Sequence, residues 1–105
     1  MMKTLAVLLL TAFPLFAQVA DGDRHYAERA NGAQGARAAT GPIDAAIAAY
    51  QRAIAQNAND VEAHARLLRA YRFKGAYVAA SNDEKKKVYA LAKTAGDTAL
   101  ALVGR

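Results

Sequence analysis

The stretch GPIDAAIAAYQRAIAQNANDVEAHARLLRAYRFKG, residues 41–75, decides the fold class. Its first half carries apolar residues at a spacing of three and four, which predicts an amphipathic helix. These residues are Ile43, Ala46, Ile47, Tyr50, Ala53 and Ile54. Pro42 suits the first helical position, where no backbone N–H is needed. We expect the helix to end at Asn57-Ala58-Asn59.

The second half of the stretch predicts another helix. Asn59 as N-cap would place Glu62 at the third helical position, which is the spacing of a capping box. One face then carries Val61, His64, Ala65, Leu68, Tyr71 and Gly75. The neighbouring positions Leu67, Ala70 and Phe73 widen the apolar surface. A helix that is apolar on more than one side needs more than one neighbour, and we expect it to end at Gly75.

The sequence on either side of this stretch also predicts helices. Downstream, Ser81 and Glu84 form a second capping box. The helix after it should turn Val88, Leu91, Ala92, Ala95, Ala99 and Leu102 inward, and Lys85, Lys86, Lys87 and Lys93 toward water. Upstream, residues 23–39 predict a weak helix that breaks near Gly32 and Gly35, because glycine costs about 1 kcal/mol relative to alanine in a helix interior.

The N-terminal residues MMKTLAVLLLTAFPLFAQVA are typical of an export signal. Lys3 precedes an apolar run over residues 5–16, and small residues follow. We predict a signal peptide over residues 1–17, a short linker over 18–23 and a helical domain over 24–105. The protein would then be periplasmic or secreted. An uncleaved anchor is the alternative, although a spanning helix needs about 20 apolar residues.

The composition excludes several classes of protein. The chain has 105 residues, enough for one domain, and a formal charge of +5 that is spread along it. It contains no cysteine, so it forms no disulfide, no cysteine zinc site and no lipid anchor on cysteine. The richness in alanine favours an all-α fold. No nucleophile–base pair, phosphate loop or metal-ligand spacing is present, so we expect no enzyme activity, no cofactor and no nucleic-acid partner.

Part of the helical pattern resembles the tetratricopeptide (TPR) repeat. Ala46, Tyr50 and Ala53 fit the second helix of such a repeat, and His64 falls at a bulky aromatic position of the next. This resemblance implies TPR-like antiparallel helix pairs, about four helices in all, that form a short and incomplete fragment of an α-solenoid. His64 would then be a neutral, packed imidazole.

A narrower resemblance concerns the TatT component family of TRAP transporters. The matching residues are Glu62-Ala63, Leu67-Leu68-Arg69-Ala70-Tyr71, Lys74-Gly75 and Tyr77. It implies an exported TPR-like module that binds a protein, with the periplasmic solute-binding component of a TRAP transporter as partner. The alternatives are a carrier of a small hydrophobic or organic-acid ligand and a TPR scaffold unrelated to transport.

Four residues are candidates for contact with a partner or ligand. Arg66, Arg69 and Arg72 recur every three residues, and arginine forks suit carboxylates and phosphates. Tyr77 belongs to the matching residues and completes the set. The alternative is a solvated helix face whose aliphatic stems cover apolar surface. Tyr71 should lie on the core face, roughly opposite Arg69.

Overall fold

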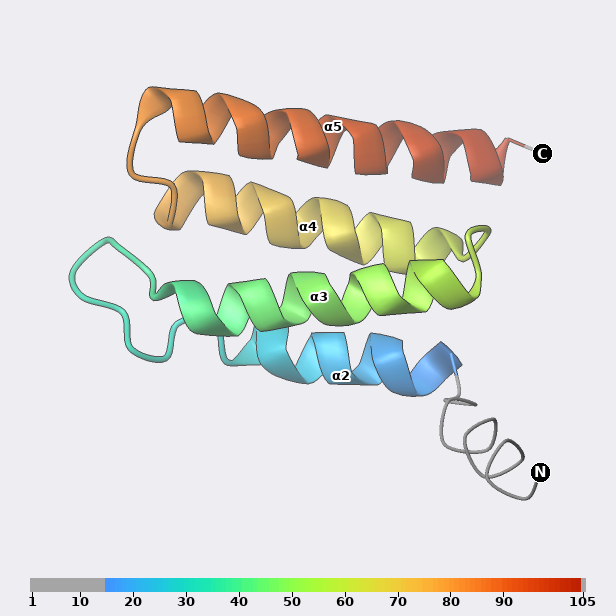
Figure 1. Ribbon diagram of the computed structural model, residues 1–105, viewed down its shortest axis with the longest axis horizontal. Helices are drawn as coiled ribbons and strands as arrows, with labels where there is room; N and C mark the ends of the chain where they lie inside the picture. The colour runs from blue at the N-terminus through green and yellow to red at the C-terminus, as the bar shows by residue number, and fades with distance from the viewer. Residues whose placement is uncertain (1–14, 105) are drawn as a thin grey trace, which may run out of the picture.

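The computed structural model describes residues 15–104 and shows four helices side by side in chain order (Figure 1). The helices are α2 (Leu15–Ala27), α3 (Thr40–Gln56), α4 (Val61–Tyr77) and α5 (Asn82–Val103). Consecutive helices run antiparallel, and each packs on the next. No strand occurs in this part of the chain, where Gln34 and Arg37 form a single isolated bridge. The predicted all-α fold of about four helices is confirmed.

The centre of the core lies between α3 and α4. The predicted stripe of α3 is buried, with Ile43, Ala46, Tyr50 and Ala53 completely covered. On α4 the buried side chains include Leu67 and Ala70, which the sequence placed at the sides, whereas Leu68 is only half-buried. The buried face of α4 is therefore rotated from the predicted one, because α3 and α5 cover it from two directions.

Both ends of α4 differ from the prediction. Its N-cap is Asp60 and not Asn59: the Asp60 carboxylate accepts a hydrogen bond from the Ala63 backbone N–H at 3.2 Å. Gly75 does not end the helix, which continues to Tyr77. Instead Gly75 leaves room for Tyr89 of α5, whose ring would lie 2.7 Å from a Cβ at this position.

The N-cap predicted for α5 is found at Ser81, but the second bond of the capping box goes to the Ala80 backbone N–H instead of that of Ser81. Ser81 Oγ accepts a hydrogen bond from the Glu84 backbone N–H at 3.1 Å. The Glu84 carboxylate accepts a hydrogen bond from the Ala80 backbone N–H at 3.0 Å. Of the inward residues expected on α5, Ala92, Ala95 and Ala99 are buried, but Leu91 is 49% exposed.

The N-terminal helix lies further upstream than predicted. The residues expected to be a linker, 18–23, are helical within α2, and residues 28–39 form turns in place of a weak helix. Gly32 and Gly35 adopt positive φ angles of 79° and 61°, which a right-handed helix does not allow. Gly22, by contrast, lies within α2, and its lack of a side chain leaves room for the ring of Tyr50.

The predicted signal peptide lies mostly outside the described residues. Residues 1–14 are not described, and Leu15 to Ala17 form the first turn of α2. Cleavage after Ala17 stays a prediction. The hydrogen bonds from α2 to α3 and α4 start at Gln18, so a chain that began there would keep them. None of the described helices is both long and apolar enough to cross a membrane.

Candidate functional site

The three arginines predicted as a binding stripe have three different environments on α4. Arg66 is half-buried and forms ion pairs with Asp23 of α2 and Glu62 of its own helix. Its charge is thus neutralised within the molecule. Arg66 holds α2 against α4 and does not take part in the groove described below.

Asp23 of α2 contacts both α3 and α4. It is not among the predicted site residues, because residues 18–23 were expected to form a linker. Its carboxylate accepts a hydrogen bond from the Tyr50 hydroxyl at 2.6 Å and pairs with Arg66. The Arg69 guanidinium lies 3.9 Å away. Burial raises the pKa of Tyr50, so its hydroxyl keeps the proton that it donates to Asp23. A signal was available, because Asp23 lies three residues before Tyr26, on the same helical face.

The side chain of Arg69, on α4, lies over the ring of Tyr26, on α2. Its guanidinium carbon lies 3.8 Å from the ring centroid, and that of Arg29 lies 4.3 Å from the same ring. Both distances allow a cation–π interaction. Arg29 also donates a hydrogen bond to the Tyr26 backbone carbonyl at 3.0 Å. Tyr26 is thereby fixed as one wall of a groove.

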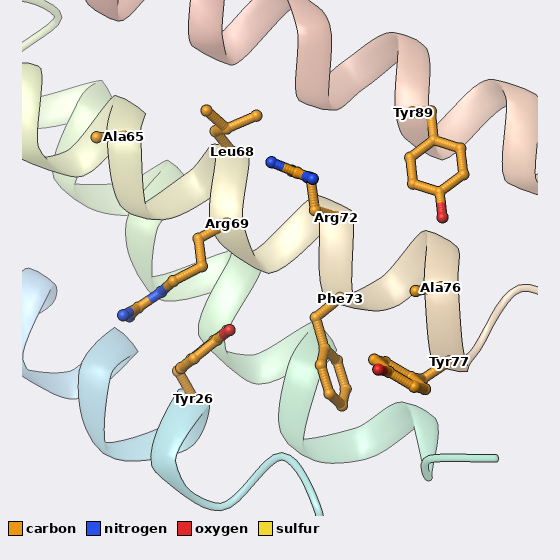
Figure 2. Close-up of a pocket in the computed structure, with 9 residues that line it drawn as sticks. All are labelled: Tyr26, Ala65, Leu68, Arg69, Arg72, Phe73, Ala76, Tyr77 and Tyr89. Carbon is orange, nitrogen blue, oxygen red and sulfur yellow. The ribbon is translucent and has the colours of Figure 1, made fainter. Parts of the chain in front are cut away.

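We define the α4 groove as a hollow of about 590 Å³ on one face of α4, between α2 and α5 (Figure 2). It is lined by Tyr26, Ala65, Leu68, Arg69, Arg72, Phe73, Ala76, Tyr77 and Tyr89. The structure therefore brings together Arg69, Arg72 and Tyr77 of the predicted set and leaves out Arg66. No carboxylate lines the groove.

Aromatic rings form most of the apolar surface of the α4 groove. Phe73 contacts Tyr26 edge to face, with centroids 6.2 Å apart, and its centroid lies 4.9 Å from that of Tyr77. Tyr89 enters from α5 and points toward the end of α4 that carries Ala76 (Figure 2). Tyr77 and Tyr89 are 51% and 42% exposed. Arg72 is exposed beside them and has no carboxylate partner among the described residues.

A second hollow, which we call the apolar pocket, lies between α3 and α5 over α4. It measures about 240 Å³ and is lined by Gln51, Ile54, His64, Leu67, Tyr71, Leu91, Thr94, Ala95 and Thr98. The hydroxyls of Thr94 and Thr98 donate to carbonyls of their own helix. The Tyr71 hydroxyl accepts from the Gln51 amide at 3.0 Å. The pocket therefore offers mainly carbon to an occupant.

His64 is a packed residue with a defined partner. It is buried, and its Nε2 lies 2.8 Å from the Ala58 carbonyl oxygen, so Nε2 carries the proton and donates it. This environment agrees with the expected packed imidazole. In the described part of the chain no cluster of three His, Cys, Asp or Glu side chains is placed to hold a metal ion.

Comparisons with protein-family models, curated proteins and solved structures find no match to this chain. The resemblances to TPR repeats and to the TatT family therefore stay predictions. What the structure adds is a basic, aromatic groove on α4 and a separate apolar pocket.

Proposed function

We propose that this protein is an exported helical binding module that holds a segment of a partner protein in the α4 groove. The observation that carries the proposal is the exposed guanidinium of Arg72, which no carboxylate of residues 15–104 pairs with, beside the exposed rings of Tyr77 and Tyr89. Exposed tyrosines and arginines are over-represented among the residues that dominate binding energy in protein interfaces.

The chemistry of the groove favours an anionic segment with apolar side chains. A carboxylate would pair with the Arg72 fork, which can offer two parallel N–H donors. Apolar side chains would cover the rings of Phe73, Tyr77 and Tyr89, and each tyrosine would keep its hydroxyl at the wet edge. The proposal includes no catalytic step and no cofactor.

The resemblance to the TatT family supports a specific partner. That partner is the periplasmic solute-binding component of a TRAP transporter, which an exported protein would meet in the periplasm. The predicted signal peptide over residues 1–17 supports the same compartment.

The apolar pocket favours a second candidate function, that of a carrier for a small hydrophobic ligand. Its volume lies just below the range of small-molecule sites, about 300–1,000 Å³, so only a small ligand would fit, and its polar groups already have partners. An organic acid would instead bind in the α4 groove, where its carboxylate can pair with Arg72.

Titration of the purified protein with the candidate solute-binding component tests the proposal. Arg72→Ala should weaken binding at least tenfold, and the affinity of the wild type should fall with added salt. Arg24→Ala is the matched control, because Arg24 is an exposed arginine on α2 outside the groove. Arg69→Ala is a poorer variant, since it also removes the contact with Tyr26.

Two results separate the candidate functions. Equal binding by wild type and Arg72→Ala would exclude the α4 groove as the binding site. Native mass spectrometry that finds a small apolar molecule retained by the wild type and lost from a folded Thr98→Leu variant would favour the carrier, because a leucine at the half-buried position 98 fills the apolar pocket.

A further inference from the structure

The α4 groove continues into a second basic hollow. This loop hollow measures about 280 Å³ and is lined by Gln34, Ala36, Arg37, Ala76, Tyr77, Ala79, Ala80 and Lys85. Ala76 and Tyr77 line both hollows, so the two adjoin at Tyr77. The loop hollow lies between the turns that follow α2 and the connection from α4 to α5.

Backbone hydrogen bonds fix the wall of the loop hollow. The Gln34 and Arg37 backbones exchange two hydrogen bonds of 2.9 and 3.1 Å, which closes a tight turn around Gly35. Gly35 supplies the positive φ angle that this turn needs. The Ala38 backbone N–H donates to the Tyr77 carbonyl at 3.0 Å. The turn is thus attached directly to the C-terminal end of α4.

The two hollows share one sign of charge. Arg69 and Arg72 line the first, and Arg37 and Lys85 line the second. Neither lining contains a carboxylate, and within residues 15–104 no ion pair engages Arg37, Arg72 or Lys85. The neighbouring Glu84 carboxylate already accepts a hydrogen bond from the Ala80 backbone N–H.

Resting on the proposed function, we propose that the bound segment is an extended acidic polypeptide that occupies both hollows. One carboxylate pairs with Arg72 in the α4 groove, and a second pairs with Arg37 and Lys85 in the loop hollow. Between them an apolar side chain packs against Tyr77, the residue common to both linings. A compact organic acid would fill only one hollow and would not use the cations of the other.

The length of α4 sets the length of the segment. The α4 groove follows the helix from Ala65 to Tyr77, and this part of α4 spans about 20 Å at about 1.5 Å per residue. An extended peptide covers about 3.3 Å per residue, so about eight to ten residues pass along the helix and over Tyr77, whereas four residues cover about 13 Å. A long and a short peptide therefore distinguish one hollow from two.

Fluorescence anisotropy with two labelled peptides tests this inference on the purified protein. The long peptide has ten residues, with glutamates at both ends and phenylalanines between them, the short one is its first four residues, which keep one glutamate, and both are amidated at the C-terminus. The wild type should bind the long peptide at least tenfold more tightly. Removing both loop cations with Arg37→Ala and Lys85→Ala should abolish that advantage and leave the short peptide unaffected. Arg72→Ala should weaken both.

Matched controls and opposite outcomes complete the design. Removing two exposed cations outside both hollows, with Lys86→Ala and Lys87→Ala, should change neither affinity by more than about twofold, because isolated surface charges contribute little. Equal affinities for the two peptides, with Arg72→Ala still harmful, would overturn the two-hollow inference and leave the proposed function standing. Failure of both peptides to bind, together with an Arg72→Ala variant that binds the solute-binding component normally, would overturn both. Tighter binding of a ten-nucleotide oligothymidylate than of the long peptide would exclude a polypeptide as the preferred ligand.

Discussion

Two contacts between neighbouring helices pair a tyrosine with a glycine, but the two tyrosines have different roles. Between α2 and α3 the ring of Tyr50 packs on Gly22, and between α5 and α4 the ring of Tyr89 packs on Gly75. Tyr50 is completely buried and donates to Asp23, whereas Tyr89 is 42% exposed in the α4 groove. A tyrosine on a glycine therefore brings two helices close together in both places, but only the second leaves the ring available to a partner.

The first prediction sharpens this difference through the rings themselves. Tyr50→Ala should cost about 3–5 kcal/mol, the usual effect of truncating a buried aromatic side chain. A loss of that size is comparable with the whole stability of a small domain. Tyr89→Ala should cost clearly less, because its ring is partly in water already. Urea denaturation followed by circular dichroism measures both, and similar losses would show that the exposed ring is as structural as the buried one.

The second prediction tests the glycines. Gly22→Ala should destabilise by about 1–3 kcal/mol, because a new methyl group in a tightly packed contact forces the backbone or the ring to move. Gly75→Ala should be nearly neutral. There the exposed ring of Tyr89 can shift, and alanine gains about 1 kcal/mol over glycine in a helix.

Gly41→Ala is the control for both glycine variants, since a Cβ there meets nothing within 4 Å. It reports the intrinsic preference of α3 alone. Thermal melts of the three variants should rank Gly22→Ala lowest. A Gly22→Ala protein that melts with Gly41→Ala would contradict the close contact with Tyr50.

The same comparison explains which parts of the fold the sequence predicts. The stripe from Ile43 to Ile54 and the Ser81 cap follow from spacing within one helix, and both are found in the structure. Gly22 and Gly75 were expected to lie in a linker and at a helix end. Their actual role depends on rings 28 and 14 residues away in the chain, which local patterns do not register.

The candidate site was predictable to a similar degree. The spacing of Arg69 and Arg72 puts them near each other, Tyr77 joined the set through the family resemblance, and all three line the α4 groove. Arg66 shares the spacing, but its partner Asp23 comes from another helix, 43 residues away. Its other partner, Glu62, lies four residues before it on α4, a spacing that favours an ion pair and that the sequence could have revealed.

The third prediction concerns the proton on Tyr50. Burial raises the pKa of Tyr50 above its ordinary value of 10.0, so the folded protein holds this proton more tightly than the unfolded chain. The resulting stabilisation is complete below pH 10.0 and is lost as the pH rises through the folded-state pKa.

Tyr50→Phe isolates that proton from the other groups that titrate in base. At neutral pH it should cost about 1 kcal/mol, the typical contribution of one hydrogen bond. The stability difference between wild type and Tyr50→Phe should then shrink above pH 10.0. A stability difference that stays constant up to about pH 11, one unit above the ordinary pKa of tyrosine, would mean that the Tyr50 hydroxyl is not held as described.

The smallest effect on stability is expected at the arginine that matters most for binding. Arg66→Ala should cost about 1 kcal/mol, because it takes a partner from Asp23 at a site that is only partly screened by water. Arg72→Ala should stay within about 0.5 kcal/mol of the wild type, as substitutions of unpaired surface residues usually do. For binding the order reverses: Arg72→Ala weakens the long acidic peptide at least tenfold, and Arg66→Ala, studied where it is still folded, binds it as the wild type does. Thermal melts and peptide titrations of both variants measure these two opposite orders. An Arg66→Ala protein that loses affinity while it stays folded would place the anion-binding charge on the α2 side of α4.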